Sequence, residues 1–279
     1  MRFLLALLPL LLAACIEDRE GCLDLAATNF DVTADIACVE PCCEFPQLQL
    51  LVRHRVVSAD LPDSLQRFRY DSVYLLGAGA DSIRFQYFRF YLQNLVLELT
   101  DGRELRVNER LELFSPTAGA LSVTDDVTVV DRDAFGVQVV GELPPEGTVR
   151  GLRFAAGLPV AFGDVSPTEF PTGHPLRVGA AEVTYDTLGG YSSLAAAFRV
   201  PPGAADSTVV RFLGEVPVIL PLNEPVVLRR GFDLTIELQL RYDRLLEDVN
   251  LAQATEQVIS NTIVDRLPNS FEILGVFQE

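Results

Sequence analysis

Four cysteines near the N-terminus are the most reactive side chains of this sequence. They are Cys22, Cys38, Cys42 and Cys43. An even number of cysteines in an exported segment predicts two disulfides, and three pairings are possible. A bridge between the neighbours Cys42 and Cys43 would be strained, so we expect Cys22 to pair with Cys38, Cys42 or Cys43. A zinc site is the alternative, and it is disfavoured because Cys-x-x-Cys pairs do not occur on both sides.

A fifth cysteine, Cys15, follows an apolar N-terminal stretch. An arginine at position 2 is followed by apolar residues 3–14. This stretch has the length of the apolar part of a signal peptide and is shorter than the ~20 residues of a membrane-spanning helix. Its end, Leu12-Ala13-Ala14-Cys15, resembles the lipobox of bacterial lipoproteins. The resemblance implies that residues 1–14 are a signal peptide and that Cys15 carries lipid; an ordinary secretory signal is the alternative.

The charge of the chain is strongly negative, and it is densest next to Cys15. The formal net charge is −17, from 39 acidic and 22 basic residues, and every basic residue is arginine. Residues 15–46 hold eight acids and one arginine, which gives −7. This charge argues against binding to nucleic acid or to an anionic membrane surface. It predicts that residues 15–46 form an acidic, Cys-rich tether held extended by repulsion. The cluster Glu17–Glu20 resembles the surface-export signal of Bacteroidota lipoproteins, and a plain solvated tether is the alternative.

The only two histidines, His54 and His174, are the candidate metal ligands. A copper or other soft-metal site needs two or three nitrogen or sulfur ligands, so few such sites are open to this chain. His54 lies on the apolar face of a predicted strand, where it is either a hydrogen-bonded core residue or a ligand. His174 lies in the sequence Phe170–Pro175, which predicts a rigid, exposed loop.

Acid pairs are the candidates for acid–base catalysis. Asp164 with Glu169, in a Pro-rich loop, would be the seat of an enzyme if that loop lined a pocket. The acids of Asp125-Asp126 and of 131–133 could hold a hard cation, although charged turns are the simpler interpretation. Ser192-Ser193 lack the Gly-x-Ser-x-Gly frame of a hydrolase. An enzyme is therefore the least supported of the function classes.

The elements that must position these residues are strands. Residues 47–56 alternate between apolar and polar side chains, as a half-buried strand does. Asp101-Gly102 predicts a hairpin turn after a long strand over 84–99. Gly/Pro clusters separate the further predicted strands, which are 127–130, 137–140, 148–154, 181–185, 192–200, 208–212, 216–220, 233–241 and 271–277. Only 243–249 and 252–266 have helical spacing, ending before Pro268. The pattern predicts an all-β, antiparallel β-sandwich with a short C-terminal helical segment, forming one domain over 47–279.

Several stretches resemble one family in their order and spacing. Residues 89–97 followed by Asp101-Gly102, the stretch Gly147–Val160, the pair Gly190-Tyr191, and Asn261 with Phe271 resemble motifs of the MbnP-like family. The resemblance covers most of 47–279. It implies a β-sandwich protein of the periplasm or cell surface that binds copper through histidines and an oxidised tryptophan. A di-haem peroxidase partner performs that oxidation in the family.

The chain departs from the family at the copper site. It contains no tryptophan, and Tyr185 and Thr187 stand at the two Trp positions of the motif. Gly163-Asp164 stand near the position of a family Asn-His, whereas His54 lies where relatives often carry a histidine. We therefore expect a non-enzymatic binding or interaction module with a degenerate copper site, anchored by lipid to the outer membrane on its periplasmic or cell-surface side. The alternative is a copper-binding protein that works with a di-haem peroxidase or another envelope protein.

Overall fold

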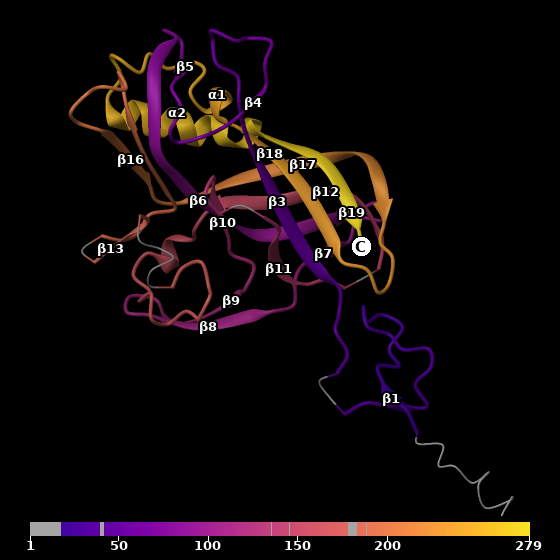
Figure 1. Ribbon diagram of the computed structural model, residues 1–279. Coiled ribbons are helices and arrows are strands. Elements are labelled where there is room, and N and C mark those ends of the chain that lie inside the picture. The colour runs from indigo at the N-terminus through magenta and orange to yellow at the C-terminus, as the bar shows by residue number, and fades with distance from the viewer. Residues whose placement is uncertain (1–17, 40–41, 135, 145, 178–182, 188) are drawn as a thin grey trace, which may run out of the picture.

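The computed structural model describes residues 18–39, 42–134, 136–144, 146–177, 183–187 and 189–279 (Figure 1). The signal peptide and Cys15 lie outside these residues. The strands are β1 (Glu20–Gly21), β2 (Ile36–Ala37), β3 (Gln47–Val56), β4 (Gln66–Arg67), β5 (Tyr74–Leu76), β6 (Asp81–Leu99), β7 (Glu104–Leu105), β8 (Arg110–Ser115), β9 (Gly119–Thr124), β10 (Thr128–Asp131), β11 (Gln138–Glu142), β12 (Thr148–Gly157), β13 (Tyr185–Asp186), β14 (Gly190–Tyr191), β15 (Leu194–Arg199), β16 (Thr208–Phe212), β17 (Glu215–Val227), β18 (Leu234–Arg241) and β19 (Phe271–Gln278). The helices are α1 (Tyr242–Leu245) and α2 (Glu256–Arg266), with 3₁₀ turns η1 (Val160–Phe162) and η2 (Leu267–Ser270).

Two sheets form the body of the protein. The larger has the order β16-β15-β6-β12-β17, and β5, β7 and β10 also pair with β6. The smaller has the order β11-β3-β18-β19, with β4 beside β3. All of these pairings are antiparallel except β3 with β18, which is parallel. The predicted antiparallel β-sandwich is therefore confirmed, with one parallel pair at the centre of the smaller sheet.

The main core lies between the two sheets. Alternate residues of β3, such as Leu48 and Leu50, are buried together with Phe88 and Phe90 of β6 and Leu238 of β18. The period of two that predicted β3 thus also decides which of its side chains reach the core. The remaining side chains of β3, among them Arg53 and Arg55, point to the outer face of the smaller sheet.

The C-terminal helical segment covers one end of the sandwich, near β16 and β5 (Figure 1). Thr255 caps α2 by accepting a hydrogen bond from the backbone N–H of Val258. Ile259 and Ile263 of α2 are buried in the main core. The predicted range 252–266 is four residues longer than α2 at its N-terminal end, because the chain enters the helix only at Thr255. No helix in the described part of the chain is long and apolar enough to cross a membrane.

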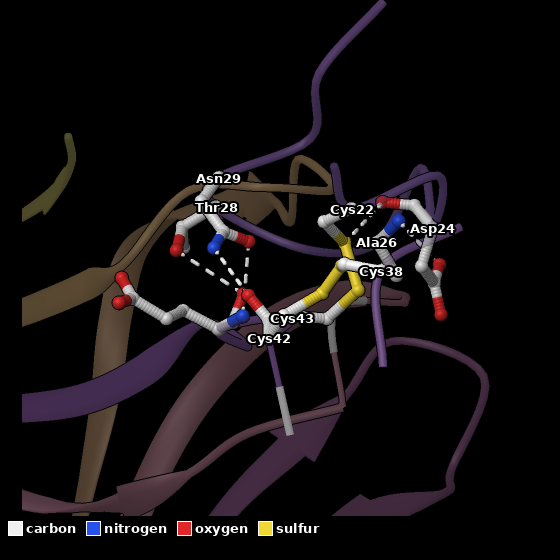
Figure 2. Close-up of a disulfide and its surroundings, with 9 residues drawn as sticks. Cys22, Asp24, Ala26, Thr28, Asn29, Cys38, Cys42 and Cys43 are labelled. Carbon is white, nitrogen blue, oxygen red and sulfur yellow. Dashed lines mark hydrogen bonds between the residues drawn. A yellow bond between two sulfur atoms is a disulfide. The ribbon is translucent and has the colours of Figure 1, made fainter. Parts of the chain in front are cut away.

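The cysteine-rich segment before β3 is folded, which corrects the expectation of an extended tether. Cys22 pairs with Cys43 and Cys38 pairs with Cys42 (Figure 2). Asn29 holds the second half of the loop, because its side chain donates to Cys42 O at 2.7 Å and accepts from Glu44 N at 2.9 Å. The disulfides constrain the loop more strongly than repulsion among its acids can extend it.

The hairpin β8–β9 and the loop after β12 differ from the predicted elements. The hairpin β8–β9 was not predicted, although Leu111, Leu113 and Ser115 are buried in alternation with exposed residues. This hairpin and the described residues between 158 and 191 enclose a second core on the outer face of β6, around Tyr91, Phe162, Phe170 and Tyr191. The predicted loop 163–175 therefore contributes buried side chains to this core, among them Phe170.

Candidate ligand pocket beside His54

A gap along one edge of β3 forms the candidate pocket. β11 pairs with this edge only as far as Leu50, where Gln138 is its partner, and β4 begins opposite Arg55. Beyond β4, the N–H of Phe68 donates to His54 O at 3.0 Å. Residues 51–53 therefore have no strand beside them on this edge within the described part of the chain. Such an edge leaves backbone polar groups available to a ligand.

Arginine side chains dominate the walls of this pocket. Its cavity of about 300 Å³ is lined by Leu51, Val52, Arg53, His54, Arg55, Arg67, Phe68, Arg132 and Gly136. The lining contains four arginines and no acid among the described residues. In a chain of net charge −17, this is a local reversal of sign. The volume is that of a small-molecule site at the lower end of the usual range of ~300–1,000 Å³.

Two of the four arginines are neutralised by neighbours, and two are not. Arg53 forms an ion pair with Glu237 of β18, and Arg132 forms one with Asp133. Arg132 also donates from Nε to Phe68 O at 3.4 Å, which holds its guanidinium beside β4. Arg55 and Arg67 form no ion pair and no side-chain hydrogen bond with any described residue. They are the direct cross-strand partners of the β3–β4 pairing, so their like charges point to the same face.

His54 lies in this pocket as a half-buried residue. Its Nδ1 is 2.9 Å from the hydroxyl of Tyr242, whose ring stacks on Phe68 with centroids 3.6 Å apart. Burial is the main cause that lowers the pKa of His54 to about 4. The charges of Asp131 and Asp133 act against this shift, and those of Arg132 and Arg67 add to it. The imidazole is therefore neutral near pH 7. This agrees with the interpretation of His54 as a hydrogen-bonded core residue.

A copper site does not fit the surroundings of His54. A metal ligand must be placed among donors that attract a cation, and histidine or cysteine donors are typical of copper. Here both the guanidiniums of Arg132 and Arg67 and the carboxylates of Asp131 and Asp133 act on the ring, and none of these groups is a histidine or cysteine donor. His174 lines a different cavity and gives no second imidazole to this one.

His174 is buried, which corrects the predicted exposed loop. Its ring stacks on Phe170 with centroids 4.7 Å apart, and only 8% of the residue is exposed. Its Nδ1 accepts a hydrogen bond from Leu176 N at 3.1 Å, so Nε2 is the nitrogen that bears hydrogen. Nε2 lies 3.2 Å from Asp125 Oδ1 but forms no hydrogen bond with a described residue. With one nitrogen accepting and the other protonated, this imidazole is poorly set to bind a metal.

Asp164, from the predicted catalytic pair, and Asp126, from the predicted cation site, both accept structural hydrogen bonds. Asp164 accepts from the Ser115 hydroxyl at 2.7 Å and from Thr117 N at 3.0 Å. Hydrogen bonding from Thr117 and Ser115 holds the pKa of Asp164 below its usual value, far from that of a general acid at neutral pH. Asp126 accepts from the backbone N–H groups of Asn94 and Leu95 at 2.9 and 2.6 Å, and burial raises its pKa to about 6.

The family motif positions Tyr185, Gly190 and Tyr191 form a small β-ladder at the second core. Tyr185 of β13 pairs with Tyr191 of β14, and their ring centroids are 4.9 Å apart. The hydroxyl of Tyr191 donates to Leu176 O. Gly190 has φ of 73°, and a Cβ there would lie 1.7 Å from Gly163 O, so only glycine fits. These contacts give the three residues a packing role.

The cysteine sulfurs of Cys38, Cys42 and Cys43 lie within 4.8 Å of one another. All three are in disulfides, with Cys22 as the fourth member, so they offer no thiolate to zinc.

The arginine pocket was not anticipated from the sequence. Its one local signal is Arg53-His54-Arg55, and nothing near Arg67 indicates that it lies opposite Arg55.

Comparisons with known proteins give little further information. No protein-family model matches the sequence, and no curated protein matches it. Among solved structures, MbnP from Methylosinus trichosporium is similar, with a TM-score of 0.46 and 14% sequence identity. The alignment covers 72% of this chain and 78% of that one. A similarity this distant assigns no site residue and no function to the chain.

Proposed function

We propose that this protein is a non-enzymatic binding module of the bacterial cell envelope. The observation that supports the proposal best is the pocket beside His54, a cavity with arginine walls and no general acid or base suited to neutral pH. Asp164, one of the two acids that the sequence offered for catalysis, accepts from a hydroxyl and a backbone N–H group instead. These features support binding as the function of the pocket.

The sequence before β3 supports an anchored location. Lipid on Cys15 would hold the protein on the outer membrane, at its periplasmic or cell-surface side. The two disulfides of residues 22–43 suit an oxidising compartment. The membrane, through this lipid, and another envelope protein are the partners that we propose; nucleic acid is not among them.

Anchoring is tested with the full chain expressed in a bacterial host that processes lipoproteins. Wild-type protein and Cys15→Ser are fed an alkyne fatty acid, and the label is read after affinity capture. We expect label and membrane fractionation for wild type, and neither for Cys15→Ser. Label that persists in Cys15→Ser, or wild type that carries none, would contradict the proposal.

The copper alternative is separated by metal loading. Purified full chain is incubated with Cu(I), desalted and analysed for bound metal, alongside His54→Ala and His174→Ala. We expect no stoichiometric copper in any of the three. Copper bound one to one by wild type and lost in His54→Ala would replace the present proposal with a copper-binding function.

A further inference from the structure

We propose that the pocket beside His54 binds a small oxyanion, a phosphate or carboxylate group, between Arg55 and Arg67. This inference rests on the proposed binding function and names its ligand class. The key observation is that these two arginines are direct partners across β3 and β4 and that neither forms an ion pair with a described residue. Like charges in this position destabilise a strand pair unless an anion lies between them.

Acidic partners distinguish the arginines of this face from one another. Arg241 stands beside Arg55 on the adjacent strand β18, but its guanidinium pairs with Asp243, with Nη2 to Oδ2 at 2.6 Å. Arg53 pairs with Glu237 in the same way. On this face the acids therefore satisfy Arg53 and Arg241 and leave Arg55 and Arg67 open. Both of these arginines line the pocket.

The chemistry of the open pair selects the ligand class. A guanidinium offers a planar fork of N–H donors that matches the two oxygens of a carboxylate or phosphate. Arg132, held by Phe68 O, places a third guanidinium at the same cavity. Phe68, Leu51 and Val52 add apolar wall for the carbon part of a ligand. The cavity of about 300 Å³ admits a small molecule or a single headgroup.

A titration of the full chain, purified in a non-ionic detergent at low ionic strength, tests the inference. The probes are inorganic phosphate, succinate and a short-chain phosphatidylglycerol, and the readout is isothermal calorimetry. We expect one-to-one binding of at least one probe. The probe that binds most tightly separates a free phosphate, a free carboxylate and a lipid headgroup as the source of the anion.

Arg67→Ala and Arg67→Lys locate the binding site. Loss of one charge-assisted contact weakens binding by about tenfold or more, so we expect that loss for Arg67→Ala. Arg67→Lys keeps the charge without the fork and should fall between Arg67→Ala and wild type. Arg103→Ala is the matched control, because Arg103 is exposed, pairs with Asp101 in the β6–β7 turn and changes the net charge equally. Binding to Arg103→Ala should be unchanged.

The outcomes keep the inference separate from the proposed function. No binding of any probe, or equal binding by wild type and Arg67→Ala, overturns the oxyanion site even when Cys15 is lipidated. A chain without lipid on Cys15 overturns the anchored module and leaves the oxyanion site standing. A thermal scan confirms that each variant is folded before its binding is compared.

Discussion

The two histidines of this protein lie in different surroundings. His54 shares a cavity with Arg53, Arg55, Arg67 and Arg132. His174 has Asp125 as its close charged neighbour, at 3.2 Å, and is stacked on an aromatic ring. Arginines and the acids Asp131 and Asp133 therefore both act on His54, whereas His174 has an acid as its close charged neighbour.

The groups around a histidine decide what it can bind. Both histidines are equal candidates for a metal by residue type alone. The cavity beside His54 offers no second histidine and no cysteine among the described residues, and at His174 the hydrogen bond from Leu176 N occupies the nitrogen that a metal would need. The metal prediction for both residues stays a prediction, and the geometry around each argues against it.

The largest expected effect is on the second core, which holds His174. Phe170→Ala removes a fully buried ring that packs on Phe162, His174 and Tyr191. Truncation of a buried Phe costs about 3–5 kcal/mol of unfolding free energy. We expect faster hydrogen exchange at residues 158–176 than in wild type, measured by mass spectrometry, while β3 and β18 keep their protection. Equal loss of protection in both regions would show that the two cores unfold as one.

The next effect is a pH dependence that comes from His54. Its pKa falls from 6.5 in the unfolded chain to about 4 in the folded protein, so the unfolded state binds the proton first. Stability is therefore lost as pH falls from about 6.5 to about 4, by roughly 2–3 kcal/mol. The difference in unfolding free energy between wild type and His54→Gln, from urea titrations at several pH values, should show this slope. A difference that does not vary between pH 7 and pH 4 would contradict it.

The pH dependence of stability that comes from Asp126 has the opposite sign to that of His54. Its pKa rises from 3.8 to about 6 on folding, so the stability it contributes is full below 3.8 and is lost as pH rises through about 6. The comparison with His54→Gln isolates His54 because Asp126 is present in both proteins.

A smaller effect concerns the neighbours Asp125 and Asp126. Asp126→Ala leaves Asn94 N–H and Leu95 N–H without their acceptor at a bulge where Asn94 has φ of 53°. We expect a loss of about 1–3 kcal/mol in urea unfolding. Asp125→Ala is the matched control, because its carboxylate accepts no hydrogen bond from a described residue, and it should change stability by less. Equal losses would mean that the bulge does not depend on Asp126.

The smallest expected effect is a change in stability from substitution of Arg67 in the arginine pocket. Without an anion, Arg67→Gln removes the repulsion with Arg55 and should raise the unfolding free energy by about 0.2–1 kcal/mol. The thermal midpoint is compared in a buffer free of phosphate and carboxylates. A lower midpoint for Arg67→Gln would show that Arg67 supports the fold in a way that its contacts do not reveal.

Local patterns in the sequence predicted the strands well, and distant pairings could not be predicted. The range 47–56 is the same in sequence and structure, because alternation is a property of neighbouring residues. The β8–β9 hairpin carried the same signal at Leu111 and Leu113 but was missed. The arginine pocket depends on the register of β4 against β3, across a loop of several residues, and no local pattern sets that register. The burial of His174 depends likewise on the second core, whose members are far apart in the chain.

The most direct test of the account is a crystal structure of the full chain grown with selenate, an oxyanion that scatters anomalously. We predict an anomalous peak between the guanidiniums of Arg55 and Arg67 in wild-type crystals, and none there in Arg67→Ala. A pocket without selenate in wild type, under conditions where the ion is in large excess, would contradict the central claim that these arginines form an oxyanion site.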